Sequence, residues 1–237
     1  MKKFLVAFFG CAAFSASALA ADMPLKAPMA PAPLAGSWTG FYVGVAGGYG
    51  WGSTRHSADA ISFESGIDDG LRGALVGLTY GYNWQIGNLV LGLEGDISWS
   101  DIKDTFNDNG SGFCLAGIAS CYTKLQWLGT ERARLGFSWD RWLVYATGGA
   151  AYGSVKATVA PLAPGTTITD DTRFRFGYAA GAGVEAMLAP HWSAKLEYLF
   201  VDLGTHTNYQ FTAGAFTTGD SVLVRANIVR AGLNYHW

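Results

Sequence analysis

Large apolar residues alternate with small or polar residues along most of this chain. The clearest case is the C-terminal stretch IVRAGLNYHW, at residues 228–237. One face of this stretch carries Val229, Ala231, Leu233, Tyr235 and Trp237, and the other carries Arg230, Gly232, Asn234 and His236. A period of two is typical of a β-strand whose two faces contact different surroundings. Because chain termini usually fray, we expect something to hold this strand to its last residue.

The same period recurs in seven further segments, and the sequence therefore predicts eight strands. Their expected bounds are 38–51, 72–84, 88–100, 124–139, 142–155, 172–188, 191–203 and 222–237. In most of them, aromatic and branched aliphatic residues lie opposite glycine, alanine and charged residues. The fifth segment is so rich in glycine and alanine that its facing stays open.

The connections between these segments alternate strictly between short and long. The short ones are 85–87, 140–141 and 189–190, and the long, polar ones are 52–71, 101–123, 156–171 and 204–221. One end of the assembly thus has short connections and is here called the trimmed end. The other end has long connections and is here called the decorated end. Outer-membrane β-barrels have this arrangement, with short periplasmic turns and long outer loops.

The tryptophans fall at the strand ends rather than at their middles. Those expected at the trimmed end are Trp38, Trp84, Trp139, Trp142, Trp192 and Trp237, and those at the decorated end are Trp51, Trp99 and Trp127. Trp127 and Trp139 share a face and are separated by about 28 Å along the axis of a barrel with tilted strands. This spacing is typical of two aromatic girdles around an apolar band. We predict an all-β fold, an eight-stranded antiparallel up-and-down transmembrane β-barrel whose last strand pairs with its first.

Composition agrees with this interpretation. Charged residues make up 14% of the chain, well below the roughly 25% of soluble domains. No segment after the N-terminal one approaches the roughly 18 apolar residues of a membrane-spanning helix. The net charge of −2 predicts no nucleic-acid partner. A soluble, lipocalin-like barrel would have the inverse polarity, with apolar residues inside and charges outside.

The N-terminal segment is typical of a secretory signal peptide. Lys2 and Lys3 precede a short apolar run, and Ala18-Leu19-Ala20 predicts cleavage after Ala20. Residues 21–36 are rich in proline and alanine and predict an extended periplasmic linker, followed by the barrel over 37–237. Cleavage leaves two cysteines, Cys114 and Cys121, and an even count in an exported chain favours a disulfide.

Charged residues on the faces opposite the aromatics should line the lumen. The expected luminal network consists of Glu94, Asp96, Lys124, Arg132, Arg134, Arg175, Glu185, Lys195, Glu197 and Arg230, with Arg173 beside it. One interpretation is an ion-selective pore, and the other is a set of paired charges that fills the lumen. We favour the second interpretation, a lumen filled by paired charges. Eight strands leave room for little beyond side chains, and buried charges must be paired.

No pattern of an enzyme or of a cofactor site emerges. Two His–Asp neighbours, His56 with Asp59 and His206 with Asp202, lack a positioned nucleophile. The acidic stretch around Asp101, Asp104 and Asp108 lacks the ordered alternation of a calcium loop. We therefore assign no catalytic residue, no metal ligand and no cofactor.

Five stretches carry a resemblance to a known family. They are SWTGFYVGVAGGYGWG (37–52), WLGTERARLGF (127–137), YATGGAAYG (145–153), WSAKLEYLFVDLG (192–204) and the terminal VRAGLNYHW. With these the chain resembles the small outer-membrane β-barrel porin family of alphaproteobacteria, which includes immunogenic surface proteins. The resemblance implies an OmpA-like barrel in the bacterial outer membrane, concerned mainly with envelope integrity.

The resemblance also implies partners, and this sequence departs from the family pattern at two positions. Periplasmic chaperones and the barrel assembly machinery would act during biogenesis, the latter reading a terminal signal that includes Leu233, Tyr235 and Trp237. Trp237 stands where phenylalanine is commoner. Glu131 faces lipid by its parity, where the family usually has an apolar residue. We expect Glu131 near the outer interface or in a subunit contact, the alternative being a bulge that turns it inward.

The expected function is therefore structural, with four loops exposed at the cell surface and outer-membrane lipid as the surrounding partner. Two alternatives stay open, a small, weakly conducting porin and a surface barrel whose loops bind a ligand. Whether barrels associate with one another also stays open.

Overall fold

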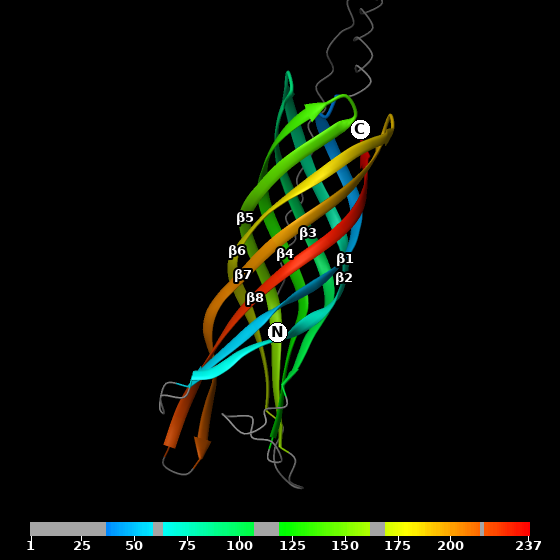
Figure 1. Ribbon diagram of the computed structural model, residues 1–237. Coiled ribbons are helices and arrows are strands. Elements are labelled where there is room, and N and C mark those ends of the chain that lie inside the picture. The colour runs from blue at the N-terminus through cyan, green and yellow to red at the C-terminus, as the bar shows by residue number, and fades with distance from the viewer. Residues whose placement is uncertain (1–36, 59–63, 107–118, 162–168, 214–215) are drawn as a thin grey trace, which may run out of the picture. The chain divides into compact units, whose positions relative to one another are not determined.

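The computed structural model describes residues 37–58, 64–106, 119–161, 169–213 and 216–237. These residues form eight strands that pair in chain order and close into one barrel. Figure 1 shows the strands strongly tilted and winding around the barrel. Their bounds are β1 Gly40–Ala58, β2 Glu64–Ile86, β3 Leu89–Phe106, β4 Ala119–Trp139, β5 Trp142–Pro161, β6 Thr169–Ala189, β7 Trp192–Ala213 and β8 Phe216–His236. No helix within the described residues is long and apolar enough to cross a membrane.

The C-terminal strand forms the seam of the barrel. β8 pairs antiparallel with β1, from Tyr42 opposite His236 to Ala58 opposite Asp220. The other neighbouring pairs are antiparallel as well. The predicted fold class is thereby confirmed. This terminal strand is paired with two neighbours, β7 and β1, which accounts for an alternation that continues to its end.

The two ends of the barrel differ. At the short-turn end, the turns at 87–88, 140–141 and 190–191 join β2 to β3, β4 to β5 and β6 to β7. At the other end, here called the extended end, the strands run well past the outer tryptophans. The prediction of long loops at 52–71, 101–123, 156–171 and 204–221 was wrong for most of these residues, which are strand. Their polar composition hid the strands, because paired backbone beyond a membrane needs no apolar outer face.

Apolar side chains cover the exterior of the barrel over its membrane-spanning part. Exposed examples on four different strands are Val45, Leu78, Leu93 and Leu196. Their neighbours along each strand point inward and are small or polar, as the alternation predicts. In water this exterior would be a large apolar patch, so it defines the surface that contacts lipid.

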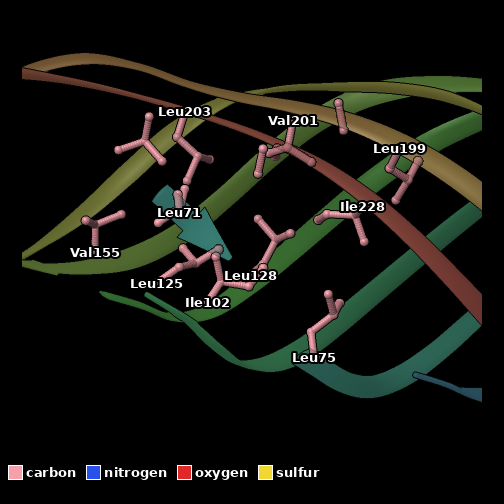
Figure 2. Close-up of a cluster of buried hydrophobic side chains, with 14 residues drawn as sticks. Leu71, Leu75, Ile102, Leu125, Leu128, Val155, Leu199, Val201, Leu203 and Ile228 are labelled. Carbon is pink, nitrogen blue, oxygen red and sulfur yellow. The ribbon is translucent and has the colours of Figure 1, made fainter. Parts of the chain in front are cut away.

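The interior consists of three layers along the barrel axis, and the order of residues along β3 shows them. Val90 belongs to an apolar cluster at the short-turn end, Glu94 and Asp96 are buried charges, and Ile102 belongs to a larger apolar cluster toward the extended end. Figure 2 shows this larger cluster, with Leu71, Leu125, Val155 and Leu203 pointing toward one another. The larger cluster was not predicted, because the sequence interpretation placed apolar residues outside throughout.

Polarity therefore inverts along the barrel. Over the membrane, apolar side chains face out and charges face in. Toward the extended end, Ile102 and Leu125 are buried inside, whereas Asp101 and Lys103 are exposed outside. The extended end is thus built like a soluble barrel, with its core in the lumen and its charges in water.

On β3 this inversion is a change of residue type and not of facing, because Trp99, Asp101 and Lys103 are all exposed and Ile102 is buried. A change of facing occurs on β4, where the pairing with β5 shifts register between Leu125 and Trp127. One extra residue in a strand turns every following side chain to the opposite face. Leu125, expected on the outer face with Trp127, is therefore inside at 2% exposure.

Trp38 also departs from the prediction. It was expected in the lipid-facing girdle, yet its side chain is fully buried at the short-turn end, in one cluster with Val90 and Leu143. Its backbone N–H donates to Gln85 Oε1 at 2.7 Å. Gly40 lets the chain turn inward there, with a φ of 143° and no room for a Cβ, which would lie 2.8 Å from the Trp237 carbonyl oxygen.

Candidate functional site: a buried charge network in the lumen

Cross-strand pairing places charges of opposite sign side by side in the middle layer. Glu94 on β3 lies directly opposite Arg132 on β4, and Glu197 on β7 lies opposite Arg230 on β8. Directly opposite residues share a face of the sheet. The alternation that puts apolar residues on the outside therefore puts both pairs in the lumen, where each side chain is at most 2% exposed.

Glu94 is the centre of this network. Its Oε1 accepts from Arg132 Nη2 at 2.7 Å. Its Oε2 accepts from Lys195 Nζ at 2.7 Å, from the Tyr42 hydroxyl at 2.8 Å and from Arg134 Nη1 at 3.3 Å. One carboxylate thus joins β1, β3, β4 and β7 through the interior. Such contacts compensate the cost of removing a carboxylate from water, which an unpaired group could not bear.

Two further carboxylates hold the side of the network toward the extended end. Arg230 Nη1 donates to Asp96 Oδ1 at 2.7 Å, and Arg230 Nε donates to Glu197 Oε2 at 2.7 Å. Arg132 donates to Glu197 Oε1 at 3.0 Å and, through Nε, to the Thr130 hydroxyl at 2.8 Å. Each guanidinium therefore bridges carboxylates that come from different strands.

Glu185 anchors the side toward the short turns. It accepts from Arg134 Nη2 at 2.7 Å, from Asn234 Nδ2 at 2.7 Å and from the Ser193 hydroxyl at 2.5 Å. Ser193 Oγ also lies 2.8 Å from His236 Nε2. Glutamate and histidine thus meet on the same serine hydroxyl, whereas a catalytic triad needs the acid on the other ring nitrogen.

The charges joined by these contacts balance. The carboxylates are Glu94, Asp96, Glu185 and Glu197, and the cations in contact with them are Arg132, Arg134, Lys195 and Arg230. Arg134 also lies over the Tyr145 ring, 3.9 Å from its centroid. The arrangement can hold opposite walls of the barrel together. Among the described residues, one apolar cluster lies on either side of it along the barrel axis.

Hydrogen bonds join eight of the ten residues expected in this network. Arg175 is fully buried inside the barrel, and Lys124 is the exception. Lys124 lies outside, 34% exposed in its side chain, and its Nζ donates to Asp101 Oδ1 at 2.7 Å. The bulge at 125–127 turns it outward. That hydrogen bond, and a weaker one from Lys103, lower the pKa of the Asp101 carboxyl below its usual value. Arg173, expected beside the network, is exposed.

Several polar residues of the network were missed from the sequence. Tyr42, Tyr145 and Thr130 donate to its carboxylates or contact its guanidinium groups. Tyr42 has the parity of Gly44 and Ala46, so the inward face of β1 would have indicated it. The facing of β5, which holds Tyr145, was open.

Glu131 is exposed on the outer face, as its parity predicts. The Tyr80 hydroxyl donates to its Oε1 at 2.5 Å. Gly95, between them on β3, makes this contact feasible, because a Cβ there would lie 2.4 Å from the Tyr80 ring and 2.7 Å from Glu131 Oε2. The carboxylate therefore has a donor within its own barrel.

The remaining tryptophans expected in the girdles lie mostly on the outside. Seven of them are exposed, namely Trp51, Trp84, Trp99, Trp139, Trp142, Trp192 and Trp237. Trp127 is half-buried against Tyr152 and Phe174, whose ring centroids are both 6.1 Å away. In the terminal segment, Leu233 is exposed and Tyr235 contacts the rings of Trp192 and Trp237.

Other sequence expectations fall partly outside the described residues. Ala20, the linker and Cys114 lie outside them, as do the side chains of Cys121, His56 and His206. Asp202 is described, and it accepts from Arg225 Nε and from the Gly204 backbone N–H, both at 2.8 Å. Within the described residues, no three histidine, cysteine or acidic side chains gather as metal ligands.

A closed barrel with an apolar outside and a charged inside defines the class of integral outer-membrane β-barrels. Residues 6–236 match the family described as outer membrane protein beta-barrel domain, and the chain belongs to that family. It is 38% identical over 94% of its length to the 31 kDa outer-membrane immunogenic protein of Brucella melitensis, covering 95% of that protein. It is 34% identical to the 22 kDa outer membrane protein of Rhizobium leguminosarum, over 80% of this chain and 75% of that one.

Solved structures with similar folds are also outer-membrane barrels. OprG from Pseudomonas aeruginosa matches with a TM-score of 0.47 and 14% identity, over 85% of this chain and 99% of that one. The protease OmpT from Escherichia coli matches with a TM-score of 0.48 and 10% identity, over 84% of this chain and 97% of that one. The family match and the two relatives, rather than these structures, identify the protein as a small outer-membrane barrel of the alphaproteobacterial type.

Proposed function

We propose that this protein is a closed, non-conducting barrel that supports the integrity of the outer membrane. The observation that carries the proposal is the layered interior, in which Glu94 and its partners are buried between two apolar clusters. A conducting pore needs a hydrated path, and eight strands enclose little more than their own side chains. Contacts across the lumen instead favour a stable, closed barrel that serves as a structural protein of the outer membrane.

Single-channel recording tests this proposal. The refolded protein, added to a planar bilayer, should give no steady conductance. A variant with Glu94→Gln, Arg132→Gln and Arg134→Gln removes the centre of the network and serves as the comparison. Steady wild-type current that changes in this variant would overturn the proposal and establish a small charge-selective porin.

We also propose that the extended end faces the surroundings of the cell, because barrels of this class put short turns on the periplasmic side. The description of the relatives as immunogenic outer-membrane proteins supports an exposed surface. Antibodies against the segments between β1 and β2 and between β3 and β4 should label intact cells. Labelling only after the outer membrane is opened would reverse the orientation.

Biogenesis completes the proposal. Cleavage after Ala20, a linker over 21–36 and a Cys114–Cys121 disulfide follow from the sequence, as does recognition of Leu233, Tyr235 and Trp237 by the assembly machinery. N-terminal sequencing and mass spectrometry with and without reductant test the first and third of these. We propose no catalytic activity, and the grouping of Ser193, His236 and Glu185 is buried and lacks triad geometry.

A further inference from the structure

Four cations lie side by side on the outer surface near the extended end. Arg72 on β2 is directly opposite Lys103 on β3, Lys103 is opposite Lys124 on β4, and Lys124 is opposite Lys156 on β5. We call these residues the cation row. Residues paired in this way share one face of the sheet, with Cβ atoms about 5 Å apart. The row therefore concentrates positive charge along four consecutive strands.

The cation row points outward. The preceding or following residue on each strand is buried inside, namely Leu71, Ile102, Leu125 and Val155. Arg72 and Lys103 are exposed, and Lys124 and Lys156 are partly exposed. The four side chains thus lie on paired strand residues rather than in a loop.

Like charges directly opposite one another destabilise a sheet. We therefore ask which groups offset the repulsion between these cations. Asp101 offsets part of the charge, with Lys124 Nζ at 2.7 Å and Lys103 Nζ at 3.4 Å. Asp101 is shared by Lys103 and Lys124, so these three side chains together keep a net charge of +1. An external anion would remove the repulsion.

The position of the row indicates which anion. Trp99 and Trp127 are paired with each other and lie next to the row, on its side toward the short-turn end. Lys124 is three residues beyond Trp127, or about 5–7 Å along the axis of a barrel with tilted strands. Interfacial tryptophans lie at headgroup level, so the cations reach the phosphate layer of the leaflet at the extended end.

We infer that the cation row is a binding site for the phosphate groups of a multiply phosphorylated lipid in the outer leaflet. Lys103 and Lys124 form its centre, and Arg72 and Lys156 extend it to both sides. A lipid with two separated phosphates can contact several of these cations at once, which a single small anion cannot. This inference rests on the proposed orientation, in which the extended end faces the surroundings of the cell, and is independent of whether the lumen conducts.

The test uses the refolded barrel in a zwitterionic detergent, with diphosphoryl lipid A as the probe. Each lysine near a membrane surface contributes enough attraction for about a fivefold change in affinity. The Lys103→Gln/Lys124→Gln variant should therefore bind about thirtyfold more weakly. Asp101→Asn should bind more tightly than wild type, an opposite change that a general loss of structure would not produce.

Two controls make the test specific. Arg225→Gln removes an exposed arginine on β8 that lies outside the row and pairs with Asp202, and its affinity should equal that of wild type. Dephosphorylated lipid A should bind equally weakly to wild type and to the double lysine variant. Equal affinity of wild type for both lipid forms, or equal losses in Arg225→Gln, would overturn the inference. Full competition by inorganic phosphate would instead show that the row binds free anions, and would overturn the inference that it binds a lipid headgroup.

Discussion

Lys195 on β7 donates to Glu94 on β3 across the lumen, with 2.7 Å between Nζ and Oε2. The residue directly opposite Lys195 on the neighbouring strand is Glu185, yet the ammonium group reaches the far wall instead. Strands β3 and β7 are not neighbours in the barrel. The network therefore joins walls that the backbone hydrogen bonds do not join.

This relationship makes Glu94 the most sensitive residue of the network. Glu94→Gln keeps the shape of the side chain but leaves Lys195 and Arg132 short of a counter-charge in a buried layer. We expect a loss of about 3–5 kcal/mol in the free energy of unfolding, the usual effect of breaking a buried ion pair. Urea titration of the barrel folded in lipid vesicles measures it.

Asp101→Asn is the matched control for Glu94→Gln. It removes the same charge from an ion pair that lies in water, where such pairs contribute little. Its unfolding midpoint should stay close to that of wild type. Equal midpoints for both variants would mean that the buried network does not stabilise the barrel.

The facing reversal on β4 gives a second prediction. Leu125 is buried in the apolar cluster and Lys124 is outside, opposite to a regular alternation from Trp127. Leu125→Ala should lower the free energy of unfolding by about 2–5 kcal/mol, as for other buried leucines, and Lys124→Ala should change it little. The reverse order in urea titrations would contradict the bulge.

Trp38 and Trp139 should respond differently to lipid. Both lie near the short-turn end, but Trp38 is fully buried and Trp139 is exposed on the outer face. In two variants, one with Trp139 as its single tryptophan and one with Trp38, brominated lipid should quench the fluorescence of Trp139 strongly and that of Trp38 weakly. Comparable quenching would return Trp38 to the lipid-facing girdle.

Glu131 and Tyr80 should be coupled. In Tyr80→Phe the lipid-facing carboxylate loses its donor, and we expect a loss of about 1.5–3 kcal/mol, typical of hydrogen bonds to charged groups. In the Glu131→Val background the same tyrosine change should have a much smaller effect. A double-mutant cycle from urea titrations measures the coupling, and a coupling energy near zero would place Glu131 away from Tyr80.

The alternation of apolar and polar residues determined the barrel, its strand number and its closing seam. A period of two has only one consistent facing in a lipid-bounded strand, so residues such as Leu93 and Glu94 could be assigned to opposite faces without coordinates. The charges of the middle layer were likewise readable, because Arg132, Arg134 and Glu197 lie opposite unambiguous apolar faces.

Tertiary structure alone decided the rest. An inserted residue at a bulge leaves no mark in the alternation, so the outward turn of Lys124 appears only when β4 is paired with β5. Trp38 enters the lumen because Gly40 turns the chain beside the end of β8, a contact between opposite ends of the barrel sequence. The partners of Glu94 lie on strands up to 101 residues away. Periodicity determines which face a side chain takes wherever a strand has no bulge, whereas closure of the barrel determines which residues it contacts there.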